Sequence, residues 1–212
     1  MIIDIHNHTM PRSYDSLLTP EDLIRQAKQA GLDAICLTEH DFFWEPAVVE
    51  ELSTEHGLLI LPGVEINIEE GHVLVFGLER WVYGMHQSAF LKQMVDEVGG
   101  AMILAHPYRR QLYPDEDLDS AVERACQNHI FDLVDAIEVL NGKATAKENS
   151  FSLSLSGKLG LKTTGGSDAH FPREVASCAT LFERSISCLQ ELITELKAGR
   201  FRPIDLRKES SS

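Results

Sequence analysis

Short apolar runs recur along the chain, and most end in a cluster of polar residues before a segment with helical spacing begins. Runs of this kind, rich in isoleucine, valine and leucine, are typical of buried strands. They occupy residues 1–5, 34–38, 58–61, 73–76, 102–105, 136–140 and 161–164. The pattern therefore predicts about seven strands.

Most of the intervening segments have apolar residues at helical spacing. Helices are predicted at 19–30, 45–55, 87–98, 118–127, 145–159 and 187–198. The first begins with a capping residue and a proline, Thr19 and Pro20, and ends before Gly31. Strands that alternate with helices predict an α/β fold with a mostly parallel sheet. Because polar clusters follow nearly every strand, a barrel fits better than an open sheet, where functional residues gather at one switch point.

Length and charge narrow the class of protein. With 212 residues and 43% hydrophobic content, the chain fits a single domain, predicted over 1–205, followed by a flexible tail at 206–212. Acidic residues outnumber basic ones by 33 to 19, and the net charge of -14 argues against nucleic-acid binding through a basic surface. The four cysteines form no Cys-x-x-Cys pair, and there is no signal segment or apolar run of about 18 residues. We therefore expect a cytoplasmic protein that does not enter a membrane.

The polar clusters contain six of the nine histidines together with several carboxylates. They are DIHNHT at 4–9, TEHD at 38–41, GVE at 63–65, GH at 71–72, AHP at 105–107 and GGSDAH at 165–170. Side chains at the ends of different strands meet only if those strands share one sheet or barrel. Imidazoles and carboxylates gathered in this way predict a site for more than one metal ion.

Two pairs of candidate ligands have the same spacing at opposite ends of the chain. His6 and His8, like Asp168 and His170, are two residues apart, so on an extended backbone both side chains of a pair point the same way. A single His-x-His pair is equally compatible with a structural role. Two such pairs favour metal binding. The Asp4 carboxylate is able to orient an imidazole by accepting a hydrogen bond from the ring nitrogen that does not bind metal.

Three further clusters each offer one ligand. Glu65 follows Pro62-Gly63, where its carboxylate is able to bridge two ions, and the alternative is a surface acid. His72 opens an apolar strand, so it is either a ligand or a buried core histidine. His106 ends the most apolar strand and precedes a proline, which favours a ligand at a rigid strand exit.

Taken together, these motifs resemble the polymerase and histidinol phosphatase (PHP) family. They follow the order of that family's motifs over nearly the whole chain. The resemblance implies a distorted seven-stranded β/α barrel, TIM-like, with the metal site at the C-terminal ends of the strands. It also implies two or three divalent ions (Mn²⁺, Zn²⁺ or Fe²⁺) and the hydrolysis of phosphate esters.

The resemblance also assigns ligands to three ions. The first ion takes His6, His8, Glu65 and Asp168, and the second takes Glu65, His72 and His106. The third takes Asp15, His40 and His170, although residues 10–14 form a longer segment before Asp15 than is usual in the family. The same three residues, Asp15, His40 and His170, are the catalytic candidates for protonating the leaving oxygen.

Candidate substrate contacts lie close to these ligands in sequence. Arg109 and Arg173 each come three residues after a cluster histidine, and a guanidinium is able to donate two hydrogen bonds to one phosphate. The alternative for each is a solvated surface cation. Glu138 and Asn141 lie at the tip of the strand at 136–140, where both are candidates to line the pocket, although Asn141 and Gly142 also suit a turn.

Three functions are compatible with this sequence. The first hypothesis is metal-dependent hydrolysis of a phosphate ester in a small metabolite or nucleotide, with attack by water that the ions activate. The second is an exonuclease acting on nucleic-acid ends, against which the acidic charge counts. The third is a non-catalytic metal-binding module, although the complete ligand set argues for activity.

Overall fold

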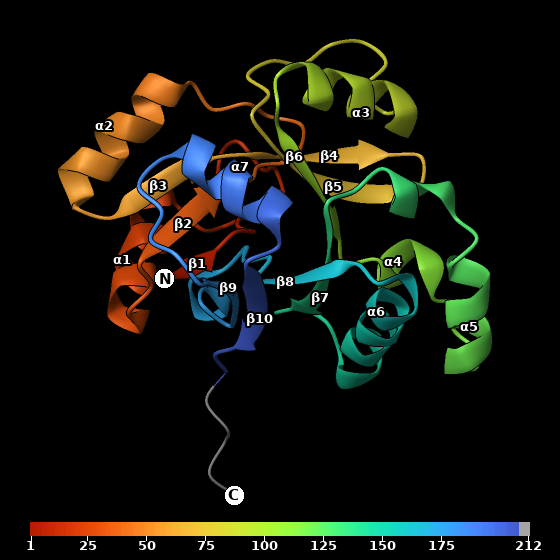
Figure 1. The fold of residues 1–212 in the computed structure, drawn as a ribbon. Helices are drawn as coiled ribbons and strands as arrows, with labels where there is room; N and C mark the ends of the chain where they lie inside the picture. The colour runs from red at the N-terminus through yellow and green to blue at the C-terminus, as the bar shows by residue number, and fades with distance from the viewer. Residues whose placement is uncertain (208–212) are drawn as a thin grey trace, which may run out of the picture.

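Ten strands form two five-stranded sheets in the computed structural model, which describes residues 1–207 (Figure 1). The order of the first sheet is β10-β9-β1-β2-β3, and that of the second is β4-β5-β6-β7-β8. The first comprises β1 (Ile2–Asp4), β2 (Ala34–Leu37), β3 (Leu59–Pro62), β9 (Cys178–Phe182) and β10 (Phe201–Asp205). The second comprises β4 (Val64–Ile68), β5 (Gly71–Phe76), β6 (Ala101–Ala105), β7 (Ala136–Asn141) and β8 (Lys162–Gly166).

Helices pack on both sheets, with α1 and α2 on the first and α3 and α6 on the second. The α-helices are α1 (Pro20–Ala30), α2 (Pro46–His56), α3 (Ser88–Glu97), α4 (Tyr108–Gln111), α5 (Leu118–Ala125), α6 (Ala146–Leu159) and α7 (Leu189–Ala198). Two short 3-10 helices are η1 (His129–Asp132) and η2 (Pro172–Glu174). As the sequence predicts, Thr19 caps α1 by accepting a hydrogen bond from the Asp22 N–H, and Gly31 ends the helix with a φ of 78°.

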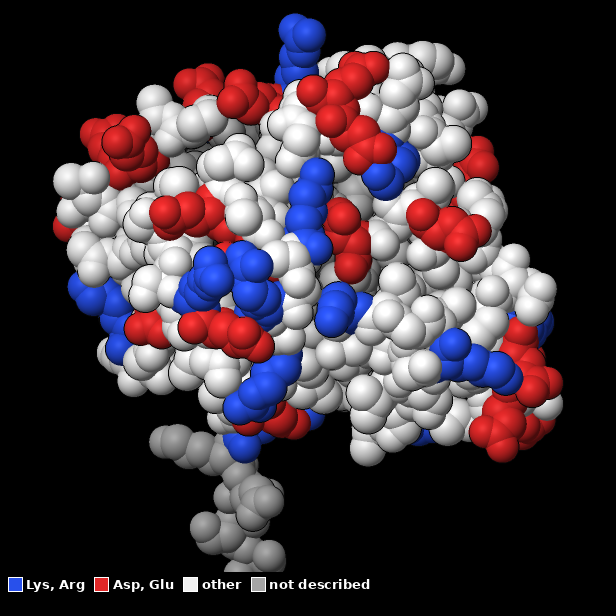
Figure 2. Space-filling view, in the orientation of Figure 1, with Lys and Arg blue, Asp and Glu red and all other residues white. Residues whose placement is uncertain are grey.

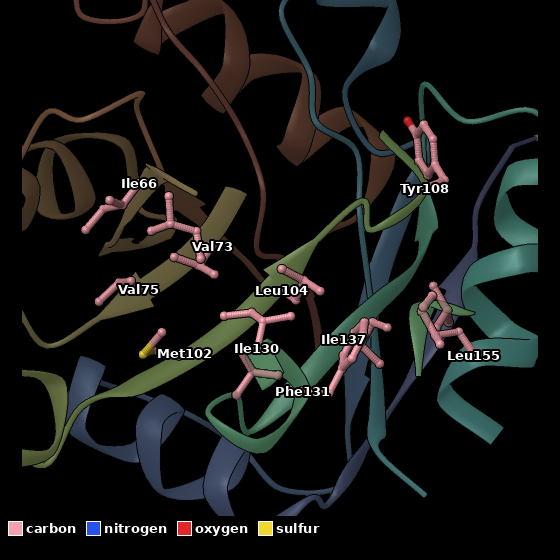
Figure 3. Packing of buried hydrophobic residues seen from close by; sticks show 14 of the residues in the cluster. Ile66, Val73, Val75, Met102, Leu104, Tyr108, Ile130, Phe131, Ile137 and Leu155 are labelled. Carbon is pink, nitrogen blue, oxygen red and sulfur yellow. The ribbon is translucent and has the colours of Figure 1, made fainter. Parts of the chain in front are cut away.

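One large hydrophobic cluster covers the outer face of the second sheet. Leu104 and Ile137 from its strands share this cluster with Phe131 of η1 and Leu155 of α6 (Figure 3). A second cluster spans both sheets, and a third lies between the first sheet and the helices α1 and α2. The two sheets therefore share a buried interior as well as having separate outer layers.

Two isolated bridges join the sheets at the place where the polar clusters lie. Asn7, just after β1, pairs with Ala169, just after β8. His40, just after β2, pairs with Glu65 in β4. The polar clusters of both sheets therefore meet where β1, β2 and β8 end and β4 begins.

The α/β class is confirmed, but the strands are more numerous and less parallel than expected. Within residues 1–207, four strand pairings are parallel and four are antiparallel. The sequence pattern does not predict β4, β9 or β10. The last of these contains Pro203, which cannot donate to a ladder and therefore suits the sheet edge that β10 occupies. Closure into a seven-stranded TIM-like barrel stays a prediction, since the strands divide into two mixed sheets.

The structure describes the first residues of the predicted tail at 206–212. The Leu206 N–H donates a hydrogen bond to the Ser177 carbonyl (3.0 Å), so Leu206 is attached to the fold. Residues 208–212, the rest of that predicted tail, lie outside the described residues. No helix within residues 1–207 is long and apolar enough to cross a membrane. The single domain over 1–205 and the cytoplasmic location stay predictions.

Candidate metal centre

The carboxylate of Glu65, only 1% exposed, lies at the centre of the histidine clusters. Five imidazoles each place a nitrogen within 3.5 Å of one of its two oxygens. The distances are 3.4 Å to His6 Nε2, 3.5 Å to His8 Nε2, 2.8 Å to His40 Nδ1, 3.1 Å to His72 Nδ1 and 2.8 Å to His106 Nε2. A carboxylate surrounded by nitrogen donors in this way has the arrangement of a ligand that bridges two ions.

Most candidate ligands follow the C-terminal ends of strands, as the sequence predicts. His6 and His8 follow β1, His40 follows β2, His106 follows β6 and Asp168 follows β8. The φ angles of His106 and Asp168 are 27° and 52°, a region that residues other than glycine rarely adopt. Such backbone conformations persist only where the surrounding structure fixes them, and they are common at functional sites.

Two candidate ligands lie at the starts of strands. His72 is the second residue of β5, which runs antiparallel to β6, and it pairs with Ala105 at the end of β6. The start of β5 therefore lies beside His106. Glu65 follows the end of β3, as the sequence predicts, but it is also the second residue of β4, a strand that the pattern does not predict.

The structure brings together the residues assigned to the first and second ions. His6 Nε2 lies 3.0 Å from His8 Nε2, and Asp168 Oδ1 lies 3.6 Å and 3.4 Å from these two nitrogens. Glu65 Oε1 lies between His72 Nδ1 and His106 Nε2, at the distances given above. Donor atoms this close to one another are able to share ions.

The residues assigned to the third ion also meet. Asp15 Oδ2 lies 3.4 Å from His40 Nε2 and 3.3 Å from His170 Nε2. His8 joins His40 and His170 in a group whose ligand atoms all lie within 4.8 Å of one another. The long segment before Asp15 therefore still delivers its carboxylate to the centre, where its side chain is 41% exposed.

The residues present fit divalent cations. Asp168 Oδ1 and Glu65 Oε2 are buried without a hydrogen bond of acceptable geometry, although Glu65 Oε2 lies 2.8 Å from His40 Nδ1. A buried carboxylate oxygen without a partner is costly unless a cation meets it. Mixed imidazole and carboxylate donors suit zinc, manganese and iron.

Buried charges alter protonation throughout the centre. Burial by itself would raise the pKa of Glu65 and Asp168. The charge of His6 and hydrogen bonds from neighbouring imidazoles have a larger effect in the opposite direction, and they hold both pKa values well below the usual range. Burial lowers the pKa of His8 to about 3. Burial also disfavours protonated His6, but the charges of Glu138, Asp168 and Glu65 raise its pKa well above the usual value. Both carboxylates are therefore ionised at neutral pH, as metal ligands must be.

Comparison with known protein families identifies the family to which this chain belongs. The model described as PHP domain matches residues 4–142, and the model described as PHP-associated matches residues 146–201. The chain belongs to the PHP family. This confirms the family recognised from the sequence motifs and the expectation of a hydrolase of the phosphoesterase class.

Relatives of this PHP chain vary in how much of it they match. A probable phosphatase from Thermoanaerobacter sp. is 25% identical over 225 residues, which cover 92% of this chain and 88% of that protein. The 5'-3' exoribonuclease Rnm of Salmonella typhimurium is 34% identical over 100 residues, 45% of this chain and 33% of that enzyme. A structure from Bacteroides vulgatus, a two-domain protein containing a predicted PHP-like metal-dependent phosphoesterase, has a TM-score of 0.69 at 22% identity. It covers 97% of this chain and 64% of the other, and it supports the fold alone.

Glu138 of β7 contacts two candidate ligands of the PHP centre, His6 and His106. Its Oε1 lies 2.9 Å from His6 Nδ1, and its Oε2 accepts a hydrogen bond from the His106 N–H (3.0 Å). A carboxylate on the far nitrogen of a ligating imidazole fixes the orientation of the ring. Asp4, expected in this role, instead accepts hydrogen bonds from backbone N–H groups, including that of Ser167 (3.0 Å). The sequence predicts that Glu138 lines the pocket at the tip of its strand, but not that it contacts His6 and His106.

Two of the predicted substrate contacts are in positions that differ from expectation. Asn141 is 1% exposed, and its amide donates to Glu138 Oε2 (3.0 Å) and Asp168 Oδ2 (3.2 Å). Its donors are therefore occupied in holding carboxylates, which suits a positioning role better than contact with substrate. Arg173 is exposed and lies over the Phe171 ring at 5.3 Å, and within residues 1–207 it makes no ion pair with a ligand.

Two positively charged side chains, those of Arg109 and Lys143, lie next to the candidate ligands. Arg109 Nη2 lies 2.5 Å from Asp168 Oδ2, and its Nη1 lies 3.2 Å from His106 Nε2, so this predicted contact is adjacent to the ligands. Lys143 Nζ lies 2.7 Å from His170 Nδ1. The sequence does not single out Lys143, because a lysine after an Asn-Gly turn is common on protein surfaces.

Proposed function

We propose that this chain hydrolyses a phosphate ester of a small metabolite or nucleotide, using two or three divalent ions held by the ligands described above. The observation that carries the proposal is the Glu65 carboxylate surrounded by five imidazole nitrogens at 2.8 to 3.5 Å. Closely spaced ions at such a site are able to bind one phosphate through several oxygens. The similarity to a probable phosphatase over 92% of this chain supports the reaction class.

The roles of the residues follow from their contacts. Ions held at the site supply Lewis acidity, which polarises phosphate oxygens and lowers the pKa of water. Glu138 keeps His6 Nδ1 occupied, so that His6 Nε2 faces the other ligands. Arg109 lies beside Asp168 with its side chain 35% exposed, where its guanidinium is able to donate to phosphate oxygens.

Asp15, His40 and His170 are the candidates for proton delivery to the leaving oxygen when no third ion occupies them. Asp15 contacts both imidazoles, and its side chain is 41% exposed, so it is open to substrate and solvent. Lys143 adds a positive charge beside His170. Asp15 is the most exposed of the three, whereas the side chains of His40 and His170 are 19% and 5% exposed, so a leaving group is able to depart on the Asp15 side.

One observation favours a second candidate, an exonuclease that removes nucleotides from nucleic-acid ends. A 5'-3' exoribonuclease is 34% identical to this chain over 100 residues. The net charge of -14 counts against it, and basic and acidic side chains are interspersed on the face that Figure 2 shows. Binding of a nucleic-acid backbone depends on phosphate contacts from many Lys and Arg residues.

Phosphate release from p-nitrophenyl phosphate and nucleoside monophosphates, with Mn²⁺ present, tests the proposal. His6→Ala and Asp168→Ala are each expected to lower kcat/KM by at least about 100-fold, because losing even a partner behind a ligand costs 10- to 100-fold. His86→Ala is the matched control, since His86 is exposed and lies outside the cluster. It is expected to retain full activity.

Three results would contradict the proposal. Digestion of labelled oligonucleotides at physiological salt, without release of phosphate from monoesters, would favour the exonuclease. Bound metal without turnover of any substrate would favour a non-catalytic module. Full activity in His6→Ala would remove the ligand assignment itself.

A further inference from the structure

Residues 10–17, which connect β1 to α1, lie against the metal centre and are held there by buried groups. Ser13 Oγ donates a hydrogen bond to the buried carboxylate of Glu39 (2.5 Å). Ser16 Oγ donates to the carbonyl of His8, a proposed ligand (2.8 Å). The position of this segment is therefore fixed relative to the ligands.

Tyr14 presents its ring to solvent from this fixed segment. The residue is 90% exposed, although its ring centroid lies only 6.2 Å from that of His40. The next residue, Asp15, lies 3.3 Å from His170. An exposed aromatic ring this close to the ligands is placed to contact the organic part of an ester whose phosphate is bound at the centre.

The surface after His40 is also aromatic. Phe42 and Trp44 pack edge to face, with 5.8 Å between their ring centroids. The Arg12 guanidinium lies 4.4 Å from the centroid of Phe42, and all three residues line a cavity of about 390 Å³. Flat rings beside a cation suit a planar heterocycle better than a flexible alkyl chain.

We propose that Tyr14 is a substrate-binding residue that stacks on the base of a nucleotide, so that nucleoside phosphates are the preferred substrates. The inference rests on the proposed function, because the centre must hold the phosphate for the base to reach the ring. Stacking tolerates different bases, since every base has a flat π face. A ring that only shields His40 from water would instead affect all phosphate esters alike.

The test compares AMP with ribose 5-phosphate, which has the same ester group and no base. In the wild type with Mn²⁺, the KM for AMP is expected to be about tenfold lower, the size of effect that one stacked base produces. Tyr14→Ala is expected to remove this difference, and Tyr14→Phe to keep it because the ring remains. Tyr83→Ala, at a tyrosine that is 91% exposed, is the matched control and should leave the KM ratio unchanged.

Binding supplies a readout that does not depend on turnover. Calorimetry compares a nucleoside 5'-phosphonate, whose carbon–phosphorus bond resists hydrolysis, with methylphosphonate, and the same preference and the same loss in Tyr14→Ala are expected. No preference in the wild type, or an equal loss for both ligands in Tyr14→Ala, would overturn the inference. Hydrolysis of ribose 5-phosphate without any preference for AMP would reject the stacking role alone. A binding preference without hydrolysis of either ester would reject the proposed function alone.

Discussion

At the scale of single residues, protons and metal ions compete for the same atoms. In the absence of ions, Glu65 and Asp168 are ionised and His8 is neutral at pH 7, so these three ligands are ready to bind. His6 differs, because burial lowers its pKa but the neighbouring carboxylates, above all Glu138, raise it well above the usual value. A cation must therefore displace a proton from His6.

Metal binding at pH 7 is expected to release at least about one proton per protein. Because the folded-state pKa of His6 is raised, the ring binds its proton at pH values below that pKa, and metal affinity is expected to fall as the pH is lowered. Calorimetric titration with Mn²⁺ in buffers of different ionisation enthalpy measures the release. Glu138→Gln is expected to reduce it, since the carboxylate that most strongly raises the pKa is removed. A binding enthalpy independent of the buffer would contradict this prediction.

The candidate ligands were easier to predict from the sequence than the residues that contact them. His6, His8, Asp168 and His170 lie in short motifs whose spacing reflects local backbone geometry, and the structure brings them together. The contacts of Glu138 depend on residues more than thirty positions away, including His6 and His106, so local spacing carries no information about them. The position of Asn141 at a strand tip is visible in the sequence, but its contact with Asp168 is not, because that contact depends on the pairing of β7 with β8.

At the scale of elements, β8 approaches the first sheet closely because its last residues are glycines. A Cβ on Gly166 would lie 2.5 Å from the His6 Cβ and 2.7 Å from Glu138 Oε1. A Cβ on Gly165 would lie 2.6 Å from the Ala179 carbonyl oxygen of β9. Any side chain here would push His6 away from the other ligands.

Gly166→Ala is expected to abolish metal binding and to destabilise the fold by about 1 to 3 kcal/mol, the usual cost of overpacking. Metal analysis and denaturant unfolding measure the two effects. Gly157→Ala is the matched control, because Gly157 lies within α6 and a Cβ added there would have no neighbouring atom within 4 Å. It is expected to stabilise the fold by up to about 1 kcal/mol, since alanine favours helix over glycine. Wild-type metal content in Gly166→Ala would contradict the role given to this close approach.

Strand direction was the part of the fold that the sequence could not supply. In β4, the sequence Val64-Glu65-Ile66-Asn67-Ile68 alternates apolar and polar residues, which fits a strand of either direction. Its antiparallel pairing with β5 depends on the short turn between them and on contacts with β6. Alternation of helices and strands therefore predicts the α/β class correctly and overestimates how parallel the sheets are.

At the scale of the whole molecule, the centre links the two sheets. The ligands around β1 and β2 belong to the first sheet, and Glu65, His72 and His106 belong to the second. Ions that bind only where both sheets meet bind the folded state and not the unfolded chain. Such selective binding stabilises the fold by mass action.

Removal of metal with EDTA is expected to lower the Tm by about 5 to 10 °C, because metal at about 100 times its Kd adds about 2.7 kcal/mol. Thermal unfolding with and without EDTA, followed by the addition of excess Mn²⁺, measures the loss and its recovery. His6→Ala is expected to show a smaller effect of EDTA, since one ligand is missing. An identical Tm for the metal-loaded and chelated proteins would show that the ions do not join the sheets.

The order of the ligands along the chain has a consequence for how the protein matures in the cell. His6 is synthesised well before Asp168 and His170, which follow it by more than 160 residues. A nascent chain without Asp168 and His170 lacks part of the candidate metal site. We therefore expect cations to bind only after the last cluster has been synthesised and the two sheets have come together.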